Sequence, residues 1–297
     1  MARKQLIDLV GNTNLVRSKN LIPNNKIELL LKLESENPGG SLKDRAAYSM
    51  LSNSIKRGTL KPGTEVIEAT GGNTGISLAM FGNILGVKMN LVLPEDSTKE
   101  RIQTMKAYGA KVILSPADQG IIGSRDLVEK LNRDNTYYRL DQFANPDNPK
   151  AHYLGTGPEI WRDTKGTVSH FVSAMGTTGT IMGVSKYLKE QNKKVQIIGT
   201  YPSEGSNIPG IRKWPQEYLP KIFDPRRIDQ MHEITEAEAK KTTKLLALKE
   251  GILAGMSSGA AVAVAIKIAE RLSSGVIVVI ICDVGERYLS SDLYNET

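Results

Sequence analysis

Residues 64–85 read TEVIEATGGNTGISLAMFGNIL. The first seven residues are rich in apolar and β-branched side chains, which is typical of a buried strand. A turn of glycine, asparagine and threonine follows, and the last ten residues have the composition of a helix. A strand, a glycine-rich turn and a helix in this order predict one unit of an α/β protein with a mostly parallel sheet.

The same unit recurs along the chain. Short apolar segments predict further strands at residues 89–94, 110–115, 168–175, 195–202 and 275–285. Segments with helical patterns predict helices at residues 97–109, 123–134, 181–192, 233–251 and 260–272. This alternation predicts an α/β fold with two doubly wound domains, whose ligands bind beyond the carboxyl ends of the strands.

The segment between the two runs is different. Residues 141–161 read DQFANPDNPKAHYLGTGPEIW, which is rich in proline, asparagine and glycine and has little periodicity. Such a composition is typical of a connection between domains. We therefore expect the chain to cross from one domain to the other near this segment.

Composition narrows the class of protein. The chain has 297 residues and a net charge of +7, spread along its length, which favours small anions over nucleic acid as ligands. The single cysteine, Cys282, cannot form an internal disulfide, and the three histidines lie far apart, so the sequence gives no support for a metal site. No signal peptide is recognisable, and the longest apolar run, 276–282, is too short to span a bilayer, so we expect a cytoplasmic protein.

Three glycine-rich turns carry candidate binding groups. The turn GTTGT at 176–180 offers N–H groups, hydroxyls and a helix start to a phosphate, or is only a tight connection. The turn TGGNTG at 70–75 offers neutral donors to a carboxylate or a phenolate, unless Asn73 or Thr74 merely caps a helix. In GMSSG at 255–259, a serine either caps a helix or binds a ring nitrogen.

A lysine stands at an unusual place in NPGGSLKDRAA, residues 37–47. Lys43 is expected in the first turn of a helix, where the dipole disfavours its ammonium form and lowers its pKa. A lysine of this kind is a nucleophile toward aldehydes, although a solvated surface lysine is the alternative. A phosphate site, an aldehyde-reactive lysine, an asparagine and a serine together predict pyridoxal 5′-phosphate as cofactor.

These motifs resemble those of fold-type II pyridoxal-phosphate enzymes, which are tryptophan synthase β-like. Within them the chain is most similar to the O-acetylserine sulfhydrylase or cysteine synthase family, over nearly its whole length. The motifs that carry this resemblance are LVGNTNLVR, NPGGSLKDRAA, EATGGNTGISLA, MGTTGT and GMSSGAAV. A closer resemblance to the B type of the family rests on LDQFANPDNPKAHY, IPGIRKWPQEYLP and IICDVGERYLS.

The resemblance implies a role for each motif. Lys43 would form the internal aldimine, Asn73 would bind the ring oxygen of the cofactor and Ser257 its pyridine nitrogen. The cofactor phosphate would be bound by Gly176, Thr177, Thr178, Gly179 and Thr180. The substrate α-carboxylate would be bound by Thr70, Gly71, Gly72, Asn73, Thr74 and Gln142.

The resemblance also implies the domains and the assembly. A smaller, mobile domain at 36–146 would carry the carboxylate loop, and a larger domain of 1–35 and 147–297 would bind the cofactor phosphate. The family is homodimeric and acts on small molecules, so neither nucleic acid nor a membrane is an expected partner.

Four residues leave questions open. Gly71 replaces the serine that the family has in this loop, which removes a hydroxyl beside the substrate, and Asn14 replaces a proline, which we expect to matter little. Arg212, in the stretch IRKW, either helps to admit an anionic sulfur donor or belongs to a solvated basic loop. Cys282 either lines the site or is packed in the core.

The implied reaction is a β-replacement. O-acetyl-L-serine and sulfide or thiosulfate would give L-cysteine or S-sulfocysteine through an α-aminoacrylate, with Lys43 as the base. The alternatives are cystathionine or cyanoalanine synthesis, β-elimination by a dehydratase, and a binding protein without turnover. The sequence leaves open the sulfur donor and whether the leaving group is acetate or phosphate.

Overall fold

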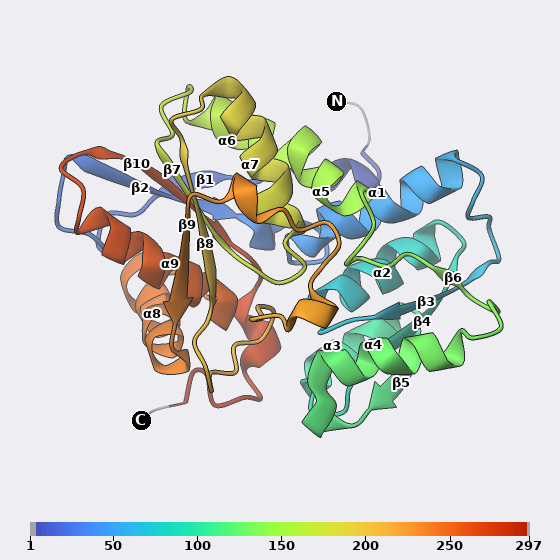
Figure 1. The fold of residues 1–297 in the computed structure, drawn as a ribbon. Coiled ribbons are helices and arrows are strands. Elements are labelled where there is room, and N and C mark those ends of the chain that lie inside the picture. The colour runs from blue at the N-terminus through green and yellow to red at the C-terminus, as the bar shows by residue number, and fades with distance from the viewer. Residues whose placement is uncertain (1–3, 296–297) are drawn as a thin grey trace.

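The computed structural model describes residues 4–295, which form two lobes side by side (Figure 1). The larger sheet has the order β1-β2-β10-β7-β8-β9. Its strands are β1 (Leu15–Arg17), β2 (Ile27–Leu33), β7 (His170–Ala174), β8 (Gln196–Pro202), β9 (Gln230–Ile234) and β10 (Gly275–Ile281). Neighbouring strands are parallel except for β1 and β2, which are antiparallel.

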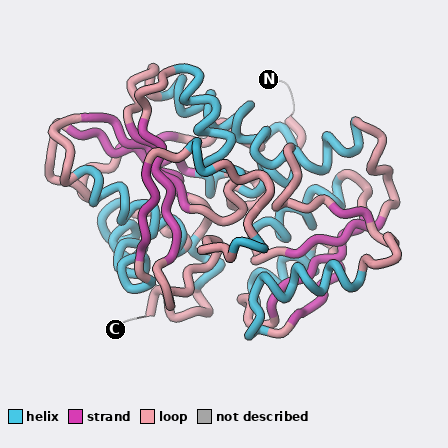
Figure 2. The backbone as a smooth tube through the Cα atoms, viewed as in Figure 1, coloured by secondary structure: helices cyan, strands magenta, loops and turns pink. Residues whose placement is uncertain are grey.

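The smaller sheet has four parallel strands in the order β5-β4-β3-β6. They are β3 (Glu65–Ala69), β4 (Lys88–Pro94), β5 (Lys111–Ser115) and β6 (Tyr138–Arg139). These strands come from one continuous part of the chain, whereas both ends of the chain contribute to the larger sheet. Figure 2 shows the two groups of strands separated by helices and loops.

Helices cover both faces of both sheets. They are α1 (Lys43–Lys56), α2 (Asn73–Ile84), α3 (Lys99–Ala107), α4 (Gly120–Leu131), α5 (Asp147–Ala151), α6 (Gly157–Asp163), α7 (Gly179–Gln191), α8 (Glu236–Glu250) and α9 (Met256–Ala269). The predicted α/β class with mostly parallel sheets is confirmed. Within residues 4–295, no helix is long and apolar enough to cross a bilayer.

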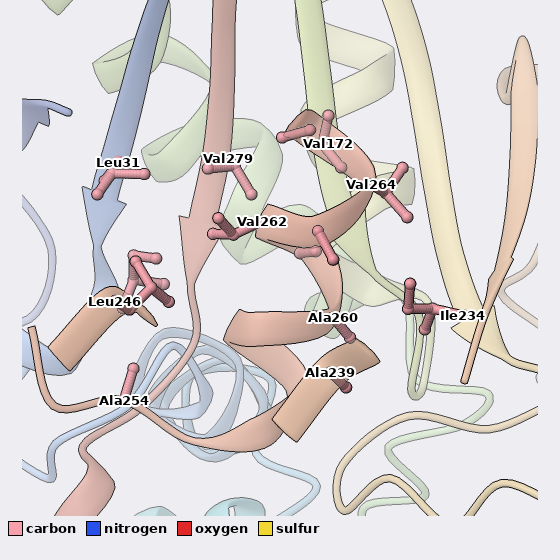
Figure 3. Close-up of a cluster of buried hydrophobic side chains, with 14 of the residues drawn as sticks. Leu31, Val172, Ile234, Ala239, Leu246, Ala254, Ala260, Val262, Val264 and Val279 are labelled. Atoms are coloured by element: carbon pink, nitrogen blue, oxygen red, sulfur yellow. The ribbon is translucent and has the colours of Figure 1, made fainter. Parts of the chain in front are cut away.

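The larger lobe has a core on each side of its sheet. On one side, Val262 and Val264 of α9 and Leu246 of α8 pack against Val172 and Val279 of the strands (Figure 3). On the other side, α6 and α7 pack against the opposite faces of β7, β8 and β10. The alternating strands therefore bury both of their faces, as expected for a doubly wound sheet.

The smaller lobe is built in the same way. Met50 of α1, Leu78 of α2 and Met105 of α3 share a core with Val66 and Leu91 on one face of the sheet. Helix α4 covers the other face, where another cluster of apolar side chains is buried. The segment predicted as a strand, turn and helix is the centre of this lobe, as β3 followed by α2.

The sequence predicted no regular element in residues 141–161, where we expect the chain to cross between domains. Most of this segment is helical: α5, a π-helical turn (His152–Thr156) and α6 follow one another without a break. Many of its buried positions carry polar residues, among them Asn148, His152 and Thr156. Because hydrogen bonds and not apolar contacts satisfy these side chains, the helical period does not appear in the hydropathy pattern.

A second correction concerns the predicted helix at 233–251. Helix α8 begins at Glu236, and the residues before it belong to the edge strand β9. Thr235 is the N-cap of α8: its hydroxyl accepts a hydrogen bond from the N–H of Glu238 at 3.2 Å. The acidic residues therefore predicted a helix start correctly, but they placed it too early in the sequence. The strand before the helix has too little apolar character to be recognised.

Candidate active site

Lys43 is the first residue of α1, at the junction of the two lobes. The N–H of the preceding Leu42 donates to the carbonyl oxygen of Cys282 at 2.9 Å, and Ser41 forms a β-bridge with Asp283. The end of β10 thus holds the start of α1 in place. Burial lowers the pKa of Lys43, although the neighbouring Asp283 acts to raise it. A neutral amine at this position is the form that attacks aldehydes and accepts protons.

A buried ionic network fixes the first turn of α1 from below. The guanidinium of Arg45 contacts Glu34 at 2.6 Å and Glu159 at 2.7 Å, and the ammonium of Lys32 lies 2.8 Å from Glu159. Burial acts to raise the pKa of Glu159, but its hydrogen bonds to Arg45 and the Arg45 charge hold it at about 2. The position of Lys43, two residues before Arg45, is therefore set by a network of full charges.

The turn at 176–180 joins β7 to α7, as predicted. Thr178 has a φ of 70°, and its hydroxyl is buried with no hydrogen-bond partner among the described residues. A Cβ at Gly176 would clash with the carbonyl oxygen of Gly210, and one at Gly179 would clash with Asn148. An unsatisfied buried hydroxyl at a helix N-terminus, in a turn whose two glycines leave no room for a Cβ, fits a phosphate group.

A neutral histidine stands behind this turn. His152 is buried, and its Nε2 lies 3.3 Å from the hydroxyl of Thr180 while its Nδ1 lies 3.0 Å from that of Thr156. Burial, together with the charge of Arg45, lowers the pKa of His152 to about 3. The histidine therefore contributes hydrogen bonds to this region without adding a charge.

Neither Asn73 nor Thr74 is the N-cap of α2, which is Gly72. The hydroxyl of Thr70 accepts hydrogen bonds from the N–H groups of Gly72 at 3.1 Å and Gly75 at 2.9 Å. The amide of Asn73 instead donates to Asp283 at 2.6 Å and accepts from Arg287 at 2.7 Å. Asn73 is thus held in a fixed orientation by two residues from near the end of the chain.

Thr74 and Gln142 meet beside this loop. The hydroxyl of Thr74 donates to Oε1 of Gln142 at 2.8 Å, and Nε2 of Gln142 donates to the carbonyl oxygen of Ala69 at 2.7 Å. Residues that are 68 positions apart in the sequence therefore form one polar surface. This contact was implied by the resemblance and not by any spacing in the sequence.

Neither serine of the turn before α9 caps that helix, whose N-cap is Gly255 without a side-chain hydrogen bond. The hydroxyl of Ser258 accepts from the N–H of Cys282 at 2.8 Å, which ties α9 to the end of β10. Ser257 is buried and lines a pocket, where a hydroxyl can bind a ring nitrogen.

These elements surround one pocket, with about 750 Å³ of space including its mouth. The predicted site residues that line it are Lys43, Gly71, Gly72, Asn73, Thr74, Gln142, Gly176, Thr177, Arg212 and Ser257. Thr70, Thr178, Gly179 and Thr180 are not among its lining residues. Thr70 acts within its own loop, and the other three stand at the start of α7.

Cys282 combines the two interpretations that the sequence left open. Its side chain is buried in the core of the larger lobe and also lines the pocket. Burial, with the nearby Asp283, raises the pKa of the Cys282 thiol to about 11. The pocket therefore presents a neutral thiol near neutral pH.

Two arginines line the pocket, one of which the sequence did not reveal. Arg212 donates to the carbonyl oxygens of Ile208 at 3.2 Å and Ile211 at 2.8 Å, so it is partly buried and not part of a solvated loop. Burial lowers its pKa, and Arg101 adds to this effect. Arg101, from α3, is buried against the ring of Tyr288, 4.8 Å from its centre. No sequence motif marks Arg101, because only the tertiary fold brings it to the pocket.

Asp283 and Tyr288 were also missed. The hydroxyl of Tyr288 donates to Oδ2 of Asp283 at 2.6 Å, while Oδ1 of Asp283 is buried and has no partner among the described residues. The only signal in the sequence was the position of Asp283 at the end of a core strand. Across residues 4–295, no three His, Cys, Asp or Glu side chains are grouped as metal ligands would be.

The comparisons with known proteins agree with this geometry. A family model described as pyridoxal-phosphate dependent enzyme matches residues 6–283. Cysteine synthase B from Pseudomonas aeruginosa is 55% identical over 290 residues, which are 98% of this chain and 97% of that protein.

Two solved structures extend the comparison to the fold. Cysteine synthase from Entamoeba histolytica has 37% identity and a TM-score of 0.93, covering 100% of this chain and 92% of that one. O-ureido-L-serine synthase has 34% identity and a TM-score of 0.93, covering 100% and 96%. With a matching family model, a full-length relative and a matching fold, the chain belongs to the pyridoxal-phosphate dependent enzymes and, within them, to the cysteine synthase family.

Proposed function

We propose that the protein is a transferase that makes L-cysteine from O-acetyl-L-serine and sulfide by β-replacement. The observation that carries this proposal is the meeting of Lys43, the loop before α2, the phosphate turn and Ser257 around one pocket. The family requires pyridoxal phosphate, and the unsatisfied Thr178 hydroxyl supports its phosphate at this turn.

The chain offers a binding group for each part of the cofactor. Lys43 would hold its aldehyde carbon, Asn73 its ring oxygen and Ser257 its pyridine nitrogen. The phosphate would lie on Gly176, Thr177, Thr178, Gly179 and Thr180. When bound, the cofactor supplies an electron sink for the negative charge that develops on the substrate α-carbon.

Lys43 moves the proton of the reaction. Its Nζ accepts the α-proton of the amino acid while acetate leaves the β-carbon, and it returns a proton to the α-carbon after sulfur has been added. The lowered pKa of Lys43 supports this role, because a base must be unprotonated near neutral pH. Because the Cys282 thiol keeps its proton near neutral pH, we assign the role of base in the pocket to Lys43 and not to Cys282.

The loop before α2 and Gln142 would bind the substrate α-carboxylate. The groups that we assign to it are Thr70, Gly71, Gly72, Asn73, Thr74 and Gln142, with Thr70 acting through the loop backbone. At the start of α2 the N–H groups of Gly72 and Gly75 donate to the Thr70 hydroxyl, so we assign the carboxylate to the N–H groups of Asn73 and Thr74.

The two pocket arginines favour an anionic co-substrate. Arg212, with Arg101 nearby, would attract thiosulfate as well as hydrosulfide, in which case S-sulfocysteine is formed. The same charges would also tolerate a phosphate leaving group. A protein with this fold is named O-ureido-L-serine synthase, which supports other β-replacements on serine derivatives as the second candidate.

We further propose a cytoplasmic homodimer in which the part at 36–146 moves as a unit over 1–35 and 147–297. The division between the two sheets supports this boundary. Light scattering of the purified protein would test the assembly, since the chain mass is 32.5 kDa and a dimer has twice that mass.

Product analysis tests the proposed reaction. The purified protein with added pyridoxal phosphate is incubated with O-acetyl-L-serine or O-phospho-L-serine and, in turn, sulfide, thiosulfate, cyanide and homocysteine. We expect cysteine with sulfide and S-sulfocysteine with thiosulfate. Pyruvate as the main product with every donor would instead identify an eliminating enzyme, and the absence of any product would indicate a binding protein.

A further inference from the structure

Glu68 is a buried carboxylate that does not line the pocket. It lies near the carboxyl end of β3 and is 3% exposed. Its Oε2 accepts a hydrogen bond from the N–H of Asp141 at 2.8 Å, and its Oε1 accepts one from the N–H of Gln142 at 3.1 Å. One carboxylate thus binds two consecutive backbone N–H groups just beyond the end of β6, the neighbouring strand.

The backbone that Glu68 binds has an uncommon conformation. Asp141 has a φ of 53°, in the left-handed region that residues other than glycine seldom adopt. Such a conformation persists only where the surroundings hold it. The two hydrogen bonds to Glu68 provide that support, because they fix the N–H groups on both sides of the Asp141 α-carbon.

The residue that follows the strained position is Gln142. Its side chain is fixed at both ends, by Ala69 and Thr74, and its carbonyl oxygen accepts from Asn148 at 2.8 Å. Gln142 lines the pocket but is only 3% exposed, so its orientation depends on the backbone that carries it.

We propose that Glu68 is a positioning residue for substrate binding: it holds the turn at Asp141 so that Gln142 and Thr74 face the α-carboxylate of the amino acid. This inference rests on the proposed function, which assigns that carboxylate to Gln142 and its neighbours. Because the whole carboxylate is needed, glutamate is required at this position and its amide is a poor replacement.

Hydrogen bonds hold the charged form of Glu68 against the effect of its surroundings. Burial, with the charge of Asp141, raises the pKa of Glu68 to about 7, while its two backbone hydrogen bonds and the charge of Arg139 act to lower it. Both N–H donors select the ionised form, since a protonated oxygen cannot accept in the same way. In Glu68→Gln, one N–H group would face the NH₂ of the new amide and lose its acceptor.

The test is steady-state kinetics of the cofactor-loaded protein and its Glu68→Gln variant. We expect the KM for O-acetyl-L-serine to rise about tenfold, as for one lost buried hydrogen bond, while kcat and the KM for sulfide change less than about twofold. The matched control is Glu65→Gln, an exposed carboxylate on the same strand, which should leave all three constants unchanged.

A double-mutant cycle with Gln142→Ala shows whether Glu68 acts through Gln142. In the Gln142→Ala background, Glu68→Gln should change the KM by less than about twofold, because the group that it positions is already absent. If the two substitutions raise the KM for O-acetyl-L-serine independently, so that their factors multiply in the double variant, the inference is overturned. An unchanged KM in Glu68→Gln alone would overturn it as well. If Glu68→Gln does not fold, Glu68→Asp replaces it in the test. This variant keeps the charge but has a shorter side chain, so we expect a KM between those of the unmodified protein and the predicted amide variant.

Two outcomes distinguish a wrong function from a wrong role of Glu68. If the unmodified protein makes no product from O-acetyl-L-serine, the proposed function is wrong. If it makes cysteine and Glu68→Gln has the same kinetic constants, the function stands and the positioning role of Glu68 is wrong.

Discussion

Gly71 and Gly72 are adjacent residues with different environments. No atom lies within 4 Å of the position that a Cβ would take at Gly71, whereas a Cβ at Gly72 would clash with the side chain of Arg101. Gly72 also has a φ of 137°. The glycine at 72 is thus required by the backbone, and the one at 71 is not.

We predict that Gly71→Ser is well tolerated and restores a hydroxyl beside the substrate. Its free energy of unfolding should change by less than about 1 kcal/mol, and the KM for O-acetyl-L-serine should fall. Gly72→Ser is the matched control and should lose about 2 kcal/mol or more, through strain and the clash with Arg101. Urea denaturation measures both variants, and equal losses at the two positions would contradict this interpretation.

His152 makes a pH-dependent contribution to stability. Its pKa of about 3 lies below the ordinary 6.5, so the unfolded chain binds the proton more readily than the folded chain. The contribution of neutral His152 is complete above pH 6.5 and is lost as the pH falls toward 3. At pH 5 the expected loss is about 2 kcal/mol relative to pH 7.5.

The measurement compares guanidinium denaturation at pH 7.5 and pH 5. The free energy of unfolding should fall between pH 7.5 and pH 5 by about 2 kcal/mol less in His152→Gln than in the unmodified protein. His232→Gln is the control, because His232 is partly exposed. An identical pH dependence in His152→Gln and the unmodified protein would show that His152 does not titrate as described.

At the scale of elements, the sequence predicts best where apolar periodicity and glycine coincide. Strand β3, the turn after it and α2 were predicted because each has a distinct residue pattern, and the turn at 176–180 for the same reason. The start of α1 at Lys43 was expected from the glycines before it. The strands β1 and β2 were not predicted, although Leu29 and Leu31 are fully buried in β2.

The predictions failed where polar residues, and not apolar ones, occupy the buried positions. Helices α5 and α6 bury Asn148 and Glu159, and these side chains are satisfied by residues far away in the sequence. Arg101 is similar, because only the packing of α3 against the C-terminal segment brings it to the pocket. Such contacts depend on the tertiary fold and leave no local pattern.

The network beneath α1 gives a prediction at this scale. Glu159→Ala would leave Lys32 and Arg45 buried without one of their partners, and we expect a loss of about 3–5 kcal/mol in the free energy of unfolding. Glu233→Ala, which removes the exposed ion pair with Lys213, is the control and should leave the denaturation midpoint unchanged. Comparable shifts in both variants would argue against a special role for the buried network.

At the scale of the whole molecule, the C-terminal segment connects the two lobes at the pocket. Arg287 donates to Asn73 of α2 at 2.7 Å and also to the carbonyl oxygen of Gly39, and Asp283 accepts from the same asparagine. Cofactor binding should therefore depend on a residue that does not line the pocket.

We predict that Arg287→Met weakens the binding of pyridoxal phosphate about tenfold, because Asn73 loses the partner that orients it. Titration of the cofactor-free variant with pyridoxal phosphate, followed by absorbance, measures this change. Arg226→Met, at an exposed position, is the control. An unchanged affinity in Arg287→Met would mean that Asn73 is oriented without Arg287.

We predict that Lys43 and the pocket around it bind pyridoxal phosphate and use it to replace the β-substituent of O-acetyl-L-serine. The most direct measurement is the visible absorbance of the purified protein during sequential addition of cofactor, O-acetyl-L-serine and sulfide. We predict a yellow protein, a change of the band on adding the amino acid, and recovery of the first band with formation of one cysteine per site. A protein that stays colourless with excess pyridoxal phosphate, or whose band does not respond to O-acetyl-L-serine, would contradict the claim.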